Sequence, residues 1–126
     1  MVWEIISSNS FILNNKMLQK DIYFANLNPT KGKEQKGRRP VVIISGNTMN
    51  KNFGVSIICP ISSKIKNYTG CVKLEKNKIN KLSEDSEIIT FQIRTIAKER
   101  MIKKIGEITD EQLKKVFFSL NEIFYY

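Results

Sequence analysis

Two arginines stand at the end of a charged loop, directly before a run of aliphatic residues. Residues 28–40 hold two prolines, two glycines, five cations and one carboxylate, and the aliphatic residues 41–44 follow. Arg38 and Arg39 can each bind a phosphate through two parallel N–H groups, because guanidinium is planar and always charged. Arg39 is the nearer to the predicted strand, whose rigid backbone would fix its direction. The loop therefore suits a polyanion, although a surface arginine or an ion pair with Glu34 is the ordinary alternative.

Two serines supply hydroxyl groups at the end of another apolar run. Ser62 and Ser63 follow Pro60 and Ile61. A hydroxyl in this position could hydrogen-bond a phosphate oxygen or orient a proton transfer. Serines beside a strand end are more often turn formers or caps, which is the alternative here. Glu34 could be a general base, a salt-bridge partner or a solvated side chain.

A third group of polar side chains alternates with apolar ones. Gln92 and Arg94 alternate with Phe91 and Ile93. In a strand this spacing puts the polar pair on one face and the apolar pair on the other. A face with glutamine and arginine can read base edges and contact phosphate. An ordinary solvated face is the alternative, and this motif alone favours it.

The excess of positive charge extends beyond the arginines. The chain has 126 residues, with 21 Lys+Arg against 12 Asp+Glu and a formal net charge of +9. Such an excess favours nucleic acid or an anionic membrane surface, although lysine can also serve solubility alone. Five lysines in two polar segments suit contact with a phosphate backbone better than catalysis. They are Lys31, Lys33, Lys36, Lys64 and Lys66.

Histidine is absent, and this excludes several kinds of active site. Without it there is no His-based acid–base catalysis, no Ser-His or Cys-His pair, and few ways to build a zinc site. Cys59 and Cys71 match no Cys-x-x-Cys motif. Buried thiols in a reducing cytoplasm explain them more simply than a disulfide does. We therefore expect no metal centre.

The N-terminal residues 1–16 differ from the rest of the chain. They carry Glu4, lack a basic segment and are interrupted by polar residues, so they do not resemble a signal peptide. No apolar run has the length of a membrane span. We expect residues 1–16 to be an extension, or the product of a mis-set start codon upstream of Met17. One domain is expected over residues 17–126.

The patterns that must position these residues indicate a mainly β domain. Strands are predicted at residues 20–27, 40–46, 55–61, 69–74 and 86–97, and a short final strand or turn at residues 101–108. The fifth is either one long strand or two strands joined by a bend near Arg94. Residues 47–54 and 76–85 are polar connections, where we expect one helical turn and a short helix respectively. Pro60 should mark a strand end, an edge or a bulge, because proline cannot donate to the ladder.

The C-terminal residues predict an amphipathic helix. Thr109 and Gln112 have capping-box spacing, and acidic residues follow the cap. Apolar residues then recur at three- and four-residue spacing and should pack on the sheet. They are Leu113, Val116, Phe117, Leu120, Ile123 and Phe124. Phe118, Tyr125 and Tyr126 fall off this stripe and hint at a subunit interface. We expect a small SH3-like barrel of short, largely antiparallel strands, covered by this helix.

Taken together, four segments resemble the MazF/PemK family of toxin endoribonucleases. Residues 21–29 are similar to its opening strand, and residues 32–43 to its G-x-E-Q-x-x-x-R-P-V-V-I loop and second strand. Residues 60–63 are similar to its P-I-T-S turn, and residues 92–96 to its Q-I-R-T-I strand. The four segments occur in the same order and at similar separations as in the family. The resemblance as a whole extends from near Met17 to the C-terminal helix.

The resemblance implies a dimeric, cytoplasmic toxin that cleaves single-stranded mRNA at a short sequence without metal or cofactor. An antitoxin would hold it inactive and provide its only link to DNA. Arg39 corresponds to the family's catalytic arginine, Ser62 to its catalytic hydroxyl, and Glu34 is a candidate third residue. Attack by the 2′-OH of RNA would leave 2′,3′-cyclic phosphate and 5′-hydroxyl ends. Residues expected to bind RNA are Lys31, Lys33, Gln35, Lys36, Arg38, Ser63, Lys64, Gln92 and Arg94.

Two positions depart from the family pattern. Lys20 stands where a glycine usually precedes Asp21, which could alter the start of the first strand. Ser62 replaces the commoner threonine and keeps the hydroxyl. Two other functions are alternatives: a non-catalytic toxin that binds DNA gyrase, and an RNA-binding module that has lost catalysis.

Overall fold

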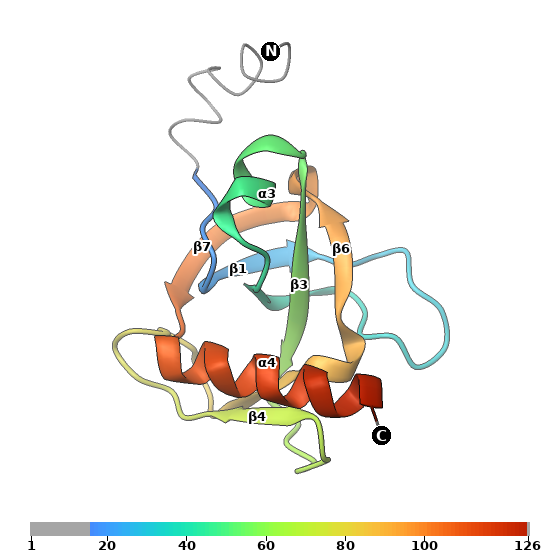
Figure 1. The fold of residues 1–126 in the computed structure, drawn as a ribbon, viewed down its shortest axis with the longest axis vertical. Helices are drawn as coiled ribbons and strands as arrows, with labels where there is room; N and C mark the ends of the chain where they lie inside the picture. Colours follow the sequence, from blue (N-terminus) through green and yellow to red (C-terminus); the bar gives the residue numbers. More distant parts are fainter. Residues whose placement is uncertain (1–15, 126) are drawn as a thin grey trace.

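The computed structural model describes residues 16–125 as one seven-stranded sheet with a long C-terminal helix (Figure 1). The strands are β1 (Asp21–Asn26), β2 (Arg38–Ile43), β3 (Val55–Ser62), β4 (Cys71–Leu74), β5 (Ser86–Ile89), β6 (Arg94–Ala97) and β7 (Met101–Glu107). The helices are α3 (Asn47–Asn52) and α4 (Asp110–Tyr125), with 3-10 turns η1 (Thr90–Gln92) and η2 (Lys98–Arg100). The predicted extension, residues 1–16, lies outside the described residues except for Lys16.

The sheet is antiparallel throughout and is organised around β3. Its order is β4-β5-β3-β2-β1-β7, and β6 also pairs with β3. The first half of β3 pairs with β6 and its end pairs with β5, so the sheet divides and bends there. Among residues 16–125 the strands do not close into a complete barrel. The predicted mainly β fold with a C-terminal helix is confirmed, in the form of an open, SH3-like bent sheet.

The central strands β2 and β3 are buried on both faces. Val42 and Cys59 belong to one apolar cluster, whereas Val41 and Ile58 belong to another. Successive side chains of a strand point to opposite faces, so the aliphatic residues 41–44 contribute side chains to both clusters. Cys59 and Cys71 are free thiols, and the disulfide alternative is therefore wrong.

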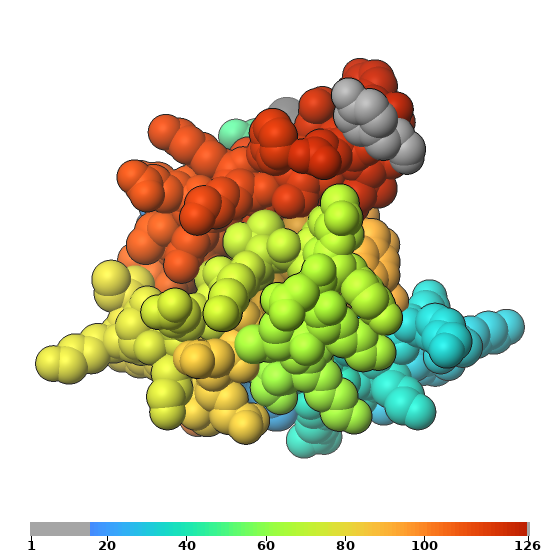
Figure 2. Space-filling model, turned by 90° about the horizontal axis from the view of Figure 1, so that it is seen from below, coloured from blue at the N-terminus to red at the C-terminus, as the bar shows by residue number. Residues whose placement is uncertain are grey.

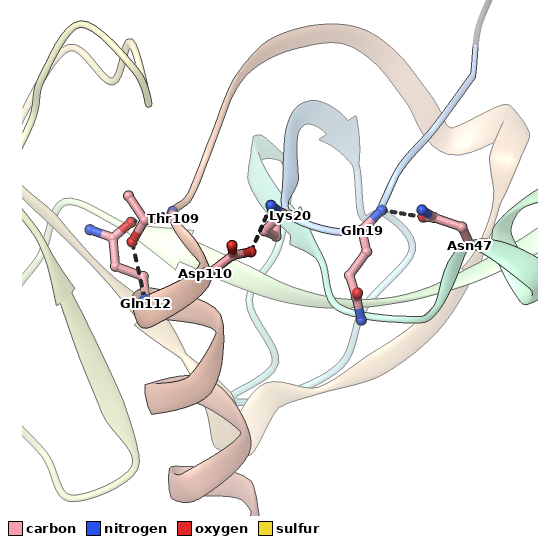
Figure 3. Close-up of polar contacts among 6 residues, drawn as sticks. All are labelled: Gln19, Lys20, Asn47, Thr109, Asp110 and Gln112. Carbon is pink, nitrogen blue, oxygen red and sulfur yellow. Dashed lines mark hydrogen bonds and ion pairs between the residues drawn. The ribbon is translucent and has the colours of Figure 1, made fainter.

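The C-terminal helix begins with the predicted capping box. The Thr109 N–H donates to Gln112 Oε1 at 2.9 Å, and the Gln112 N–H donates to Thr109 Oγ1 at 3.1 Å (Figure 3). The buried residues of α4 are Leu113, Val116 and Leu120. Phe117, Ile123 and Phe124, which were expected to pack on the sheet, are exposed. The helix lies against β4 at the edge of the sheet (Figure 1), and this narrow support covers one row of side chains rather than the whole stripe.

Residues 76–85 form turns, so the predicted short helix is wrong. Asn77 Oδ1 accepts the N–H groups of Ile79 and Asn80, each at 2.8 Å. Asn80 Oδ1 accepts the N–H of Leu82 at 3.0 Å. These side chains take backbone donors that a helix would pair with carbonyl groups.

Pro60 does not end its strand, because β3 continues to Ser62. Pro60 pairs with Val41 in the register between β3 and β2. On the other side of β3, the partner changes from β6, which ends opposite Ile58, to β5, which begins opposite Ile61. Pro60 lies in this gap, where its missing N–H leaves no ladder bond unmade.

Lys20 enters β1 with a φ of 82°, in the left-handed region that favours glycine. Its Nζ lies 2.8 Å from Asp110 Oδ1 (Figure 3). This hydrogen bond raises the pKa of Lys20 and lowers the pKa of Asp110. The lysine that replaces glycine at position 20 therefore links the start of β1 to the start of α4.

No helix within the described residues is long and apolar enough to cross a membrane.

Candidate functional site

The basic loop (residues 27–37) joins β1 to β2 and is closed at its base. The Leu27 N–H donates to the Gly37 carbonyl at 3.0 Å. The Gly37 N–H donates to Asn28 Oδ1, also at 3.0 Å. Gly37 has a φ of +78°, which glycine adopts without strain. The loop therefore returns to the sheet with a defined geometry just before the two arginines.

Two further arginines hold the first residues of this loop. Arg94 Nη1 donates to the Leu27 carbonyl at 3.3 Å. Arg100 Nη1 donates to the Asn26 carbonyl at 3.2 Å and also to the Asn28 carbonyl. Arg94 was predicted to bind RNA, and here it also supports the loop. Arg100 was missed, because nothing in the residues around it marks a contact that spans more than 70 positions.

Gln92 binds the middle of the basic loop with both ends of its amide. Its Oε1 accepts the Gln35 N–H at 3.1 Å, and its Nε2 donates to the Lys33 carbonyl at 2.9 Å. Gln92 belongs to η1, so the prediction that it shares a strand face with Arg94 is wrong. The predicted strand 86–97 breaks at η1 because its two parts have different partners. β5 pairs with β4 and with the end of β3, whereas β6 pairs with the first half of β3.

The tip of the basic loop is folded around Glu34. Its carboxylate accepts the Lys31 N–H, and its own N–H donates to the Lys31 carbonyl at 3.1 Å. Lys31, Lys33 and Lys36 are all exposed along this loop. The carboxylate thus shapes the turn that presents the lysines to solvent.

Arg39 is half-buried at the start of β2, whereas Arg38 is exposed. Arg39 Nε donates to the Lys36 carbonyl at 3.0 Å. Burial lowers the pKa of Arg39, although the guanidinium stays charged. Among residues 16–125 its terminal nitrogens make no hydrogen bond or ion pair, so both can still donate.

Ser62 ends β3, and Arg39 lies near the start of the neighbouring strand β2. The register between β2 and β3 pairs Val41 with Pro60. That is the last pair of this register, and Arg39 and Ser62 each lie two residues beyond it, near the start of β2 and at the end of β3. Ser62 is 8% exposed, and its Oγ accepts the Lys64 N–H at 3.1 Å. Because Oγ is the acceptor in that bond, the hydroxyl hydrogen is free to donate to a ligand.

Glu87, which the sequence interpretation did not include, stands opposite Ser62 on β5. It is 4% exposed, and its carboxylate accepts the Lys66 N–H at 3.1 Å. A single acidic residue inside an otherwise apolar strand, between Ser86 and Ile88, was the signal available in the sequence. Such a carboxylate needs buried hydrogen-bond partners, and the serine-containing segment supplies them.

The remaining basic residues form an open rim rather than a cavity. Ser63, Lys64 and Lys66 are exposed after β3. The face shown in Figure 2 presents this segment (green) together with the basic loop (cyan). A hollow of about 450 Å³ lies elsewhere. It is lined by Ile79, Lys81, Lys104, Ile105, Gly106 and Glu107. Within the described residues, no cluster of three or more His, Cys, Asp or Glu could hold a metal ion.

The fold and the site define a small, basic β domain with Arg39 and Ser62 at the ends of neighbouring strands and an open rim of exposed lysines. The chain belongs to the PemK-like, MazF-like toxins of type II toxin-antitoxin systems, whose family model matches residues 18–124. The resemblance found in its four sequence segments is thereby confirmed.

Individual relatives agree with this assignment. Endoribonuclease MazF of Staphylococcus saprophyticus is 40% identical over 102 residues, which are 79% of this chain and 84% of the relative. The crystal structure of MazF from Deinococcus radiodurans matches with a TM-score of 0.79 at 23% identity, covering 89% of this chain and 99% of that one. An endoribonuclease in complex with its cognate antitoxin, from Mycobacterial species, matches with a TM-score of 0.65 at 17% identity, covering 88% and 95%. The two solved structures share the fold of this chain.

Proposed function

We propose that this chain cleaves single-stranded RNA at a short sequence, without a metal ion, by attack of the RNA's own 2′-OH. An endoribonuclease of the MazF type is what its family and its 40% identity to a relative of that name indicate. The observation that carries the finer proposal is that Arg39 and Ser62 lie at adjoining ends of the paired strands β2 and β3, each two residues beyond the Val41–Pro60 pair.

The proposed chemistry assigns a role to each group. The 2′-oxygen attacks the adjacent phosphorus, the bond to the 5′-oxygen breaks, and the 5′-oxygen takes a proton from water, so that 2′,3′-cyclic phosphate and 5′-hydroxyl ends result. The free terminal nitrogens of Arg39 stabilise the charge that develops on the phosphorane. The Ser62 hydroxyl donates to a non-bridging oxygen. Either Glu34 or a water takes the 2′-OH proton. If Glu34 does so, its carboxylate also accepts the hydrogen bond from the Lys31 N–H.

The RNA backbone would follow the two basic segments. Exposed cations on both segments suit phosphate contacts, whose strength depends on salt. The residues proposed for binding are Lys31, Lys33, Gln35, Lys36, Arg38, Ser63, Lys64, Gln92 and Arg94. The Gln92 amide is already bonded to the loop, so its contribution to RNA binding is mainly to hold that loop.

The partners are proposed from the family. A structural relative was solved in complex with its cognate antitoxin, and we propose an antitoxin for this chain too, with DNA reached only through that complex. Exposed Phe118 and Tyr125 on α4 suit a homodimer interface. We place the protein in the cytoplasm and assign it no cofactor.

The test uses the full chain and a long RNA in EDTA, with cuts mapped by primer extension and the ends identified. We expect cuts at one short sequence, and none where the 2′-OH at the cleavage site is replaced by hydrogen. Arg39→Ala should reduce cleavage by about 10³-fold or more while the protein stays folded. Arg38→Ala is the matched control and should act mainly through RNA affinity.

Three results would decide against the proposal. Cutting of the 2′-deoxy substrate, or full activity of Arg39→Ala, would contradict the mechanism. RNA bound with steep salt dependence but left intact would indicate a module without catalysis. Intact RNA together with arrested DNA replication would indicate the gyrase-binding alternative.

A further inference from the structure

A buried carboxylate lies beside the proposed catalytic hydroxyl. Glu87 pairs with Ser62 across β5 and β3, so their side chains are neighbours on one face of the sheet. Burying a charge in this way is unfavourable unless its oxygens are hydrogen-bonded. No ion pair of the described residues includes Glu87. Its stabilisation must come from other donors.

The Cys71 thiol is one hydrogen-bond partner of this carboxylate, and the other two are consecutive backbone N–H groups of the serine turn (residues 62–67). The Lys66 N–H donates to Glu87 Oε1 at 3.1 Å, and the Asn67 N–H donates to Oε2 at 3.4 Å. Asn67 has a φ of +55°, a left-handed conformation that asparagine tolerates better than most residues. Both oxygens of the carboxylate are therefore used to hold one turn of the chain.

The same turn orients the hydroxyl of Ser62. The Lys64 N–H donates to Ser62 Oγ at 3.1 Å, which leaves the hydroxyl hydrogen for another acceptor. Lys64 lies two residues before Lys66, so a shift of the Lys66 backbone would displace the Lys64 N–H. The position of Ser62 Oγ is thus coupled to Glu87 through three hydrogen bonds and a short length of backbone.

We propose that Glu87 is a positioning residue for RNA cleavage: it anchors the serine turn so that the Ser62 hydroxyl points at the scissile phosphate. This role rests on the proposed function. Glu87 does not touch the reacting atoms, since both of its oxygens face backbone N–H groups. Its negative charge is directed at those donors rather than at the phosphate.

The central experiment compares Glu87→Gln with the wild type in steady-state cleavage of RNA. The amide keeps the size of the carboxylate but turns an NH₂ group toward a backbone N–H. We expect kcat to fall by about tenfold to a hundredfold, the size of effect that a misplaced catalytic group produces. KM should change by less than about threefold, because the exposed lysines remain.

Asp85→Asn is the matched control. Asp85 Oδ1 also accepts a backbone N–H, that of Lys76 at 2.9 Å, in a different loop. Asp85 is exposed whereas Glu87 is buried, so the Tm of each variant is measured to separate a loss of stability from a change in kcat, which only Glu87→Gln should show. Glu87→Asp provides a second variant that keeps the charge with a shorter reach, and its kcat should fall between wild type and Glu87→Gln.

A double-mutant cycle separates positioning from an independent role. If Glu87 acts through Ser62, adding Glu87→Gln to Ser62→Ala should cost little further activity. Additive losses, or wild-type kcat in both Glu87 variants, would overturn the inference while the proposed function stands. A wild-type protein that leaves RNA uncut would overturn both.

Discussion

The two segments that flank the candidate site are held in place in different ways. The basic loop is bonded to three side chains from distant elements, among them Gln92, and it closes on itself at Gly37. The serine turn depends on one buried carboxylate, Glu87, which accepts both of its inward N–H groups. Because it has several such contacts, the basic loop should keep its backbone conformation when one hydrogen bond is lost. The serine turn should respond to a single change, which agrees with its proposed role of fixing the Ser62 hydroxyl.

The largest difference between the segments should appear with Ser62→Ala. Removing a donor aimed at the developing charge should lower kcat by about 10²–10³-fold. Ser62→Thr keeps the hydroxyl and should stay active, and Ser63→Ala should keep a wild-type rate at saturating RNA, because the exposed Ser63 is assigned to RNA binding alone. Single-turnover cleavage measures these effects. Equal activity of Ser62→Ala and Ser63→Ala would remove Ser62 from the mechanism.

A smaller effect is expected when the basic loop loses one support. Gln92→Ala removes two hydrogen bonds to the loop but leaves those from the arginines, so RNA should bind about tenfold more weakly with less change in kcat. Hydrogen exchange at the Gln35 N–H should accelerate. Gln19 provides the control, since its side-chain Nε2 also donates to a backbone carbonyl, that of Ile44, while its N–H bonds Asn47 (Figure 3). Gln19→Ala should leave RNA binding unchanged.

Single lysines should matter less and should act through salt dependence. Lys33→Ala in the basic loop and Lys66→Ala in the serine turn should each lower the slope of log affinity against log salt by about 0.7, the value for one contact to a single strand. Lys51→Ala is the control. Lys51 belongs to α3, which leads into the first residue of β3, whereas Ser62 is at the opposite end of that strand. Filter binding to an uncleavable 2′-deoxy strand measures the slope. An equal drop in slope for Lys51→Ala would show that the charge effect is not localised.

The smallest effect is expected from the ion pair of Lys20 and Asp110, which lies outside the basic loop and the serine turn. The pKa of Asp110 is lowered by Lys20 from its ordinary 3.8, so the pair's contribution is present above that value and is lost as pH falls through the lowered pKa. Asp110→Asn should lower Tm slightly at pH 7, and the difference from wild type should disappear in strong acid. RNA cleavage should be unchanged. A change in cleavage would connect the start of β1 to the site.

Local patterns predicted most of the elements because each was decided by neighbouring residues. The capping box of Thr109 and Gln112 needs no distant partner, and the aliphatic run after Arg39 is buried on both faces wherever it lies in a sheet. Predictions failed where a distant segment intervened. Phe117 and Phe124 fitted the helical spacing, but the sheet below α4 is too narrow to cover them.

The sequence alone determined the strands, the C-terminal helix, the basic loop and the family to which the chain belongs. Those features depend on residue types at short spacing, where propensity and periodicity decide. Only the tertiary structure decided that Gln92 holds the basic loop, that Glu87 stands opposite Ser62, and that Glu87 holds the serine turn. These relations join residues more than 20 positions apart, and sheet register, which no local pattern specifies, brings them together.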